Sequence, residues 1–213
     1  MKKIKILNTE PETKADSRRV ILLAAQQEFA AHGLSGARVD SIAERAGLNK
    51  RLIYYYFNSK DQLFLEVLEQ AYSEIRAAEQ VLNLDQIDPI QAIRQLITFT
   101  WDYYLEHPEF ISLLNSENQS EATHLKKSKH IRELTSPLIQ MLGSVLLKGQ
   151  EKGLFRSGID PIQLYISIAS ICYFYLSNNH TLSTIFGKNL LSPKAKVQRL
   201  SHMIDLILGY VLL

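Results

Sequence analysis

Residues 39–57, VDSIAERAGLNKRLIYYYF, have the spacing of two short helices joined by a sharp turn. Gly47 stands where the turn requires a left-handed backbone, which glycine adopts without strain. Asn49 is a good N-cap for the second helix, which is expected to run from Lys50 to about Phe57. Apolar residues at helical spacing are expected to bury one face of each helix: Ile42, Ala43, Ala46, Leu48, Ile53 and Phe57. The stretch therefore predicts a helix-turn-helix.

The second helix of this unit carries the side chains that would meet DNA. In a helix-turn-helix, the N-terminal residues of the second helix reach base edges in the major groove. The expected base-reading residues are Lys50, Arg51 and Leu52, of which Arg51 has the fork that pairs with guanine. Tyrosine hydroxyls are suited to phosphate, and three follow: Tyr54, Tyr55 and Tyr56. With Lys60 as a further phosphate-neutralising charge, the segment predicts binding to double-stranded DNA.

The charge of the chain is divided unevenly between its two parts. Residues 1–60 contain 11 Lys or Arg and 6 Asp or Glu, whereas residues 61–213 contain 13 and 16, within a total formal charge of +2. A basic N-terminal part on a mildly acidic remainder is consistent with contact between that part and a polyanion. Residues 1–13 are expected to be a flexible basic arm, which could reach the adjacent minor groove or stay solvated.

The rest of the chain has helical periodicity almost throughout, and no segment alternates as a strand would. A helix is expected over about 15–31. Another is expected to begin at a capping box at Ser59 and to end at about residue 82. Two Asp-Pro-Ile-Gln sequences, at 88–91 and 160–163, each predict a helix start. Further helices are expected over about 108–117, 122–152, 160–180 and 192–213, with Pro137 kinking or dividing the second of them. The expected fold class is all-α, with about nine helices.

The cysteine content and apolar segments favour a cytoplasmic protein. Cys172 is the one cysteine, so no disulfide can form within the chain. Residues 161–187 lack acidic and basic side chains, but their apolar part, 164–176, is shorter than the roughly 20 residues that a bilayer requires. The sequence also lacks a signal-peptide pattern at its start. No membrane partner is expected.

The residue patterns that would indicate an enzyme are absent from the sequence. It contains no Gly-rich phosphate loop, no Gly-x-Ser-x-Gly and no His pair at zinc-helix spacing. The six histidines are scattered, which argues against a metal site. We therefore expect no catalytic residue, no metal and no cofactor.

The N-terminal segment resembles the TetR family of transcriptional regulators over about residues 15–65. The matching residues stand at fixed spacing: Ile21-Leu22, Ala24-Ala25, Phe29, Gly33, Val39, Ile42-Ala43, Ala46-Gly47-Leu48, Ile53-Tyr54-Tyr55-Tyr56-Phe57, Lys60 and Leu63-Phe64. The resemblance implies a DNA-binding domain over 14–60 and a ligand-sensing and dimerisation domain over 61–213. It also implies that Arg38 and Val39 begin the supporting helix at the DNA backbone.

Three positions depart from the pattern of this family. Arg38 stands where Thr or Ser is common, so the N-cap is weaker and a charge is added. Arg51 and Leu52 replace a small residue and Thr, and Asn49 replaces the usual Ser. These departures bear on the operator sequence and leave the expected binding mode unchanged.

The resemblance implies a homodimer formed through the last two long helices. The helix from Asp160 is apolar nearly all round, and the last helix has apolar residues at three- and four-residue steps. The expected interface residues are Leu164, Ile168, Ile171, Tyr175, Leu200, Ile204, Ile207 and Val211. A monomer core is the alternative explanation of both patterns. A single head makes few contacts, so a two-fold dimer on two half-sites is also the energetic expectation.

Aromatic and polar residues of the C-terminal part could line an apolar cavity with a few polar anchors. The expected effector-binding residues are Trp101, Tyr104, Asn115, Tyr165, Tyr173, Phe174 and Asn178, with core packing as the alternative for each. Residues 107–110 and 172–187 resemble the C-terminal domain of the pyrimidine-utilisation repressor subgroup and its nicotinate-responsive relatives. That resemblance implies a small planar or aromatic effector.

Three functions remain open at this point. The first is a homodimeric repressor released from a palindromic operator when a small-molecule effector shifts the helix between the two domains. The second is an activator or effector-independent regulator on the same scaffold. The third is a helical small-molecule-binding protein without DNA function.

Overall fold

A computed structural model describes residues 14–213, apart from the side chains of Lys14, Arg132 and Ser136; the expected basic arm over residues 1–13 lies outside the described residues. Within that range the chain forms ten α-helices, two 3-10 turns and one isolated bridge between Phe155 and Leu212. The helices are α1 (Lys14–Gly36), α2 (Val39–Ala46), α3 (Lys50–Phe57), α4 (Lys60–Gln80), α5 (Pro89–Glu106), α6 (Pro108–Gln119), α7 (His130–Glu151), α8 (Pro161–Ser177), α9 (Asn179–Phe186) and α10 (Pro193–Val211), with the turns η1 (Leu84–Gln86) and η2 (Leu125–Lys127). The all-α class is confirmed.

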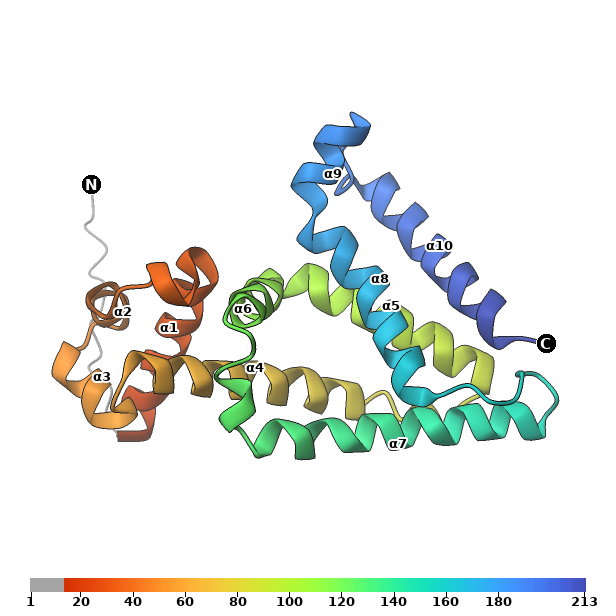
Figure 1. Cartoon of the computed structure of the whole chain (residues 1–213), viewed down its shortest axis with the longest axis horizontal. Coiled ribbons are helices and arrows are strands. Elements are labelled where there is room, and N and C mark those ends of the chain that lie inside the picture. Colours follow the sequence, from red (N-terminus) through yellow and green to blue (C-terminus); the bar gives the residue numbers. More distant parts are fainter. Residues whose placement is uncertain (1–13) are drawn as a thin grey trace, which may run out of the picture.

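A small head and a larger body make up the molecule (Figure 1). Helices α1, α2 and α3 form the head, and α4 leads from it into the body, where it packs along α7. Helix α6 lies at the junction and packs against α1. Helix α5 lies in the middle of the body, in contact with α7, α8 and α10. Two helices, α4 and α6, therefore connect the head to the body.

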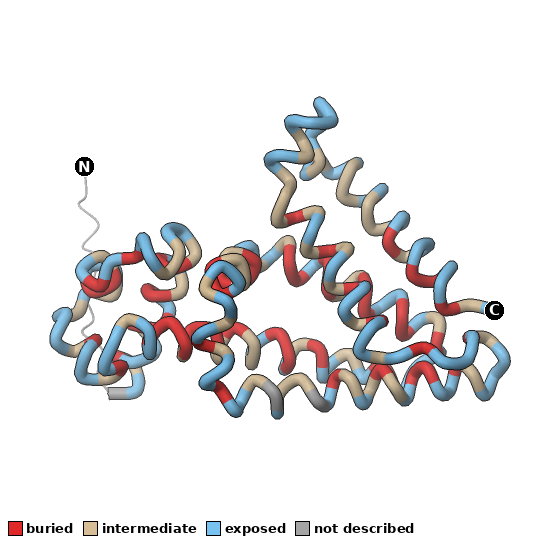
Figure 2. The backbone as a smooth tube through the Cα atoms, in the orientation of Figure 1, coloured by how far each residue is buried: buried red, intermediate tan, exposed pale blue. Residues whose placement is uncertain are grey.

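The core continues from the head into the body without a break. In the head, Phe29 of α1 meets Phe64 of α4 edge-on, with ring centroids 5.0 Å apart, and both are fully buried. Figure 2 shows the buried positions following the inner faces of α4, α5 and α8, whereas α9 has only exposed and intermediate positions. Burial of these apolar faces is the main stabilising contribution to the head–body arrangement.

The helix starts expected from capping residues are confirmed. Side-chain oxygens of Asn49, Ser59, Asp88, Asp160 and Ser192 accept backbone N–H groups in the first turns of α3, α4, α5, α8 and α10. Three of these helices, α5, α8 and α10, also have proline in the first turn, where its missing N–H costs nothing.

The prediction of one helix over 122–152 was wrong at the N-terminal end of that range. Helix α7 begins at His130, and the preceding residues form turns in which Glu121 and Ala122 have φ of 54° and 56°. The buried Glu117 carboxylate holds these turns, because its Oε1 accepts the backbone N–H groups of His124 and Leu125, each at 2.8 Å. Pro137 lies inside α7 without dividing it.

The prediction of one helix over 160–180 was also wrong, at the C-terminal end of that range. Helix α8 ends at Ser177, and the short helix α9 follows it. At this end, the carbonyls of Phe174 and Leu176 accept the backbone N–H of Asn178, and they also accept the side-chain amides of Asn178 and Asn179, respectively. This break accounts for the tenth helix.

Candidate functional sites

The helix-turn-helix is held by the residues that its spacing indicates. Gly47 has φ of 65°, and its N–H bonds back to the carbonyls of Ala43 and Glu44. The Asn49 side chain accepts the N–H of Arg51 at 2.8 Å. Ile53 and Phe57 are buried, so one face of α3 is fixed against the head and the opposite face is turned outward.

The outward face of α3 brings together a cation and tyrosine hydroxyls. Arg51 is exposed, and its guanidinium has no ion-pair partner within residues 14–213. Tyr54 and Tyr55 are 43% and 66% exposed, and the half-buried Tyr56 meets Tyr55 edge-on at 5.2 Å between ring centroids. Leu52 is half-buried beside them. The arrangement can offer a guanidinium fork and phenol donors to a nucleic acid.

Lys50 connects α3 to α2. Its Nζ lies 2.8 Å and 3.0 Å from the two carboxylate oxygens of Asp40. The hydrogen bond between them lowers the pKa of Asp40 and raises the pKa of Lys50. Because the pair is exposed, salt and solvent weaken it. A phosphate contact by Lys50 would therefore replace its contact with Asp40.

Of the three other residues predicted to contact DNA, Lys60 and Val39 have side chains engaged within the head. Lys60 Nζ donates to the carbonyls of Leu34 at 2.8 Å and Ala37 at 3.2 Å, which leaves one of its three N–H groups. The side chain of Val39 is buried, so only its backbone is open at the start of α2. The side chain of Arg38 is exposed.

Helix α2 starts without a side-chain cap from Arg38. Its start is held instead by Glu28, a buried residue of α1 whose Oε1 accepts the backbone N–H of Arg38 at 3.2 Å. Glu28 also faces Arg45 of α2, with 3.7 Å between Oε2 and Nη2. The sequence reasoning missed Glu28. An acidic residue beside Phe29, within the apolar face of α1, could have indicated a buried carboxylate with a structural role.

Helix α6 carries the polar contacts between head and body. Ser116 Oγ accepts the N–H of Leu34 from α1 at 3.0 Å. Glu117 Oε2 lies 2.7 Å from His124 Nδ1, and the His124 ring meets Phe64 of α4 edge-on at 5.1 Å. Glu117 and His124 are both buried. A movement of α6 would therefore be transmitted to α1 and α4.

A cavity of about 220 Å³ lies between α4, α5, α6 and α8. Three predicted effector-binding residues line it: Tyr104, Tyr165 and Tyr173. Phe110 lines it as well, together with residues that the sequence reasoning missed, which are Tyr72, Arg76, Leu114, Asn118, Ala169 and Ser170.

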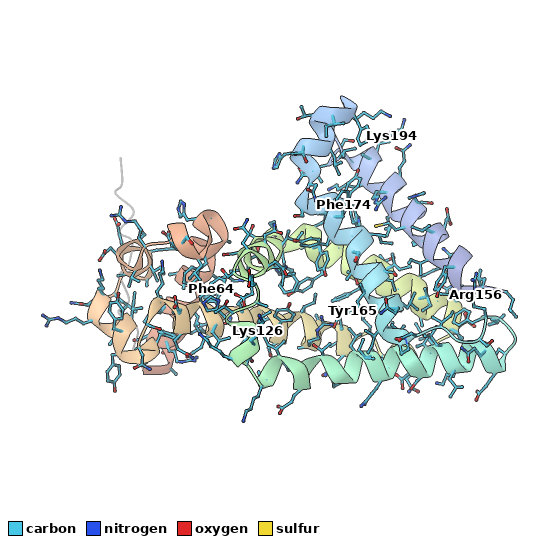
Figure 3. All side chains as sticks on the ribbon, viewed as in Figure 1. Phe64, Lys126, Arg156, Tyr165, Phe174 and Lys194 are labelled. Atoms are coloured by element: carbon cyan, nitrogen blue, oxygen red, sulfur yellow. The ribbon has the colours of Figure 1, made fainter. Side chains whose placement is uncertain are left out.

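The remaining predicted effector-binding residues lie outside this lining. Trp101 is buried against Tyr175, with 5.6 Å between ring centroids. The Tyr173 hydroxyl donates a hydrogen bond to Asn115 Oδ1, so Asn115 helps to hold a lining residue in place. Phe174 is 57% exposed, and Asn178 bonds to a carbonyl of its own helix. Figure 3 shows Tyr165 and Phe174 at opposite ends of α8.

Arg76 is the charged group of the cavity. It is 4% exposed, with Nη1 at 2.5 Å from Glu79 Oε2 and Nη2 at 2.6 Å from the Tyr165 hydroxyl. Its guanidinium carbon lies 5.2 Å from the centre of the Tyr165 ring. Burial raises the pKa of Glu79 to about 7, against the lowering effect of Arg76. The sequence could have indicated this pair, because the charged residues at positions 76 and 79 continue the helical spacing of the buried face of α4.

Three larger hollows are surface grooves. One of about 450 Å³ follows α5, where most of its lining residues are exposed. A second, of about 650 Å³, lies between the end of α8 and the start of α10. A third, of about 430 Å³, lies between α1 and α4, beside His130. The 220 Å³ cavity is the better candidate for a small ligand because buried aromatic and charged groups converge on it.

Helices α8 and α10 expose apolar side chains that differ from the predicted interface residues. Leu164, Ile168, Ile207 and Val211 are buried within the single chain, and Ile171, Tyr175, Leu200 and Ile204 are half-buried against its core. The apolar residues open to a partner are their neighbours Ile162, Ile166 and Phe174 on α8 and Val197, Leu206 and Tyr210 on α10.

Within residues 14–213, no helix combines the length and apolar character needed to cross a membrane. Over the same range, no three His, Cys, Asp or Glu side chains are grouped as metal ligands. Cys172 is buried beside Met203, and burial raises the pKa of its thiol to about 12, so it is not a reactive thiolate at neutral pH.

Comparison with known proteins assigns both parts of the chain. The family described as bacterial regulatory proteins, tetR family, matches residues 21–67, and the tetracyclin repressor-like C-terminal domain matches residues 89–207. The HTH-type transcriptional repressor NicS of Pseudomonas putida is 44% identical over 192 residues, which cover 90% of this chain and 91% of NicS. The HTH-type transcriptional regulator RutR of Escherichia coli is 29% identical over 175 residues, or 81% of this chain and 80% of RutR.

Solved structures agree with the fold. The transcriptional regulator SCO4942 of Streptomyces coelicolor superposes with a TM-score of 0.69 at 22% identity, over 92% of this chain and 98% of SCO4942. Both domain matches, the relatives along most of the chain and the exposed face of α3 lead to one assignment: the chain belongs to the TetR family of DNA-binding transcriptional regulators.

Proposed function

We propose that the chain is a homodimeric repressor that leaves a palindromic operator when a small molecule binds the 220 Å³ cavity. The observation that carries this proposal is the path of α4. Its N-terminus packs against α3 in the head, and its residues Tyr72 and Arg76 line the cavity. Over 21 residues, an α-helix spans about 30 Å, so α4 can transmit a shift at the cavity to the head as a rigid element.

A second connection runs through α6. Phe110, Leu114 and Asn118 line the cavity, and Ser116 and Glu117 on the same helix hold α1 and the turns before α7. A ligand that binds one arrangement of these helices better than the other shifts the population between them. In a dimer, this changes the spacing of the two α3 helices, which must fit successive major grooves about 34 Å apart.

In this proposal, the outward face of α3 binds DNA. Arg51 reads a base, and Leu52 adds an apolar contact beside it. Tyr54, Tyr55 and Tyr56 donate to phosphates, and Arg38, Lys50 and the remaining N–H of Lys60 add positive charge at the backbone. Asn49 and Val39 act through the helix starts that they form. Exposed apolar residues of α8 and α10 form the dimer interface.

The relatives support repression as the direction of regulation. NicS, 44% identical to this chain, is a repressor, and a head released by an effector suits the same role. An activator or an effector-independent regulator on the same scaffold is the second candidate. A gel-shift titration on the DNA next to its own gene, at several salt concentrations, tests the proposal. Absence of a sequence-selective, salt-dependent shift would leave only a small-molecule-binding role.

Replacement of Arg51 by alanine is expected to relax specificity at one base position. The cost on the preferred operator should be about 1–3 kcal/mol, because the guanidinium fork to a guanine is lost. The measurement is the affinity of both proteins for a set of operators that differ by one base pair each. Arg94→Ala, on the exposed side of α5, is the matched control and should bind like the wild type. Equal losses on every operator would mean that Arg51 contacts phosphate only.

A further inference from the structure

A basic groove lies at the corner of the body where α8 ends and α10 begins. This groove of about 650 Å³ is lined by three cationic side chains, Lys188, Lys194 and Arg199, and no acidic side chain is among its lining residues. Both lysines are exposed, and neither has an ion-pair partner within the described part of the chain. The groove therefore presents positive charge that its own chain does not balance.

Arg199 is held in the groove by contacts that leave its charge unpaired. Its Nη2 donates to the carbonyl of Ile171 on α8 at 2.8 Å, and its guanidinium carbon lies 5.0 Å from the centre of the Tyr175 ring. Its Nε is buried without a hydrogen-bond acceptor among the described residues. A cation that is already fixed in place binds an incoming carboxylate well, because little side-chain entropy remains to be lost.

The position of the groove argues against DNA as the source of this anion. Figure 3 shows Lys194 at the start of α10, well away from the head that contains α3. The groove instead adjoins the exposed apolar side chains proposed to meet a second copy, where Phe174 is 57% exposed and Val197 is 71% exposed. Apolar burial drives association, and charge sets orientation. A second copy of this chain is therefore the partner that the surroundings of the groove favour.

One carboxylate side chain is available on the surface of α8 and α10. Between residues 161 and 213 the sequence contains four lysine or arginine residues but a single acidic residue, Asp205. Asp205 is exposed on α10 and has no ion-pair partner within residues 14–213. It follows the groove residues Gln198 and His202 by seven and three positions, so helical spacing places all three on one side of α10. This side of α10 therefore changes from basic to acidic along its length.

We infer that, in the homodimer, Asp205 of each copy binds the basic groove of the other copy, where Lys194 and Arg199 face it. The inference rests on the proposed homodimer and adds the register of its interface. A two-fold interface is reciprocal, so one antiparallel crossing of the two α10 helices forms both contacts at once. A register that brings the two grooves together is disfavoured, because it places like charges opposite each other.

Two variants with exchanged charges test the inference. Asp205→Lys, and a double variant with Lys188→Glu and Lys194→Glu, each place like charges in both contacts of their own homodimer. Each should dimerise at least about tenfold more weakly than the wild type at low salt. The lysines are changed because they are exposed, whereas Arg199 also holds α8. The measurement is the dimer dissociation constant from sedimentation of the full-length proteins.

An equal mixture of the two variants is expected to form mainly heterodimers. In a heterodimer, the lysine introduced at position 205 meets the introduced glutamates, and the wild-type Asp205 of the other copy meets a wild-type groove, so both contacts are attractive. Random pairing gives about half heterodimers, and native mass spectrometry should show clearly more than this. Half or fewer heterodimers, or an Asp205→Lys protein that dimerises as tightly as the wild type, would overturn the inference.

The matched control is Glu133→Lys. It makes the same charge change at an exposed position in the first turn of α7, on the opposite side of the body (Figure 1), and should dimerise like the wild type. A free anion is the alternative occupant of the groove. If about 10 mM phosphate raises the melting temperature of the wild type but not of the double variant, at matched ionic strength, the groove binds a free anion and the inference is wrong.

The failure of this inference differs from the failure of the proposed function. If the wild type dimerises and binds its operator but the mixture shows no preference for heterodimers, the ion pairs are wrong and the repressor proposal stands. If the wild type is a monomer at the concentrations at which it binds DNA, the proposed homodimer itself is wrong.

Discussion

Replacement of Leu206 by glutamate is expected to convert the proposed dimer into monomers and to lower affinity for a two-half-site operator by at least about a thousandfold. Leu206 lies on α10 and is 50% exposed in the single chain, on the surface proposed to meet a partner. A two-fold interface would bury the new charge twice, without an acceptor arranged for it. A monomer keeps only the contacts of one α3 helix with one half-site. The measurements are sedimentation velocity and operator binding at one protein concentration.

The control for Leu206→Glu is Val81→Glu. Val81 is 76% exposed at the end of α4, away from α8 and α10, so this change adds the same charge to an apolar surface position. It should leave both the dimer and DNA binding unchanged. Circular dichroism checks that both variants fold. A Leu206→Glu protein that remains dimeric would place the interface elsewhere on the chain.

The head could be predicted closely because its signals are local. Gly47 needs a left-handed backbone, Asn49 caps α3, and Ile53 and Phe57 bury one face within a single turn of each other. Each of these features depends on residues near in the sequence, so spacing alone fixes the geometry. The two contacts of Lys60 within the head could not be predicted in this way, because its partners, the carbonyls of Leu34 and Ala37, lie more than 20 residues away in the sequence.

The body was predicted less well because its decisive contacts are distant in sequence. Arg76 and Tyr165 are 89 residues apart, and only the packed fold shows that they meet at a cavity. Burial of Leu164 and Ile168 likewise depends on which face of α8 meets α5, and both faces of that helix are apolar. Periodicity identifies an apolar helix without saying which of its faces meets its own chain.

Loss of the Glu117 carboxylate is expected to lower the free energy of unfolding by about 3–5 kcal/mol in Glu117→Ala. Glu117 is 2% exposed and accepts three hydrogen bonds, from the backbone N–H groups of His124 and Leu125 and from His124 Nδ1. Its removal leaves these buried donors unpaired, which costs far more than the loss of an exposed contact. The measurement is denaturant unfolding followed by circular dichroism, at one protein concentration because a dimer is more stable when concentrated.

Two further variants separate the role of the carboxylate from that of the side chain in general. Glu117→Gln keeps a carbonyl oxygen for the two backbone N–H groups. Its loss in free energy of unfolding should therefore be less than half of the loss in Glu117→Ala. Glu106→Ala removes a glutamate from the exposed side of α5 and should stay within about 0.5 kcal/mol of the wild type. Equal stability of Glu117→Ala and Glu106→Ala would mean that the turns before α7 hold without Glu117. In that case α6 would connect the cavity to the head through Ser116 and apolar packing alone, and the path through α4 would carry most of the proposed coupling.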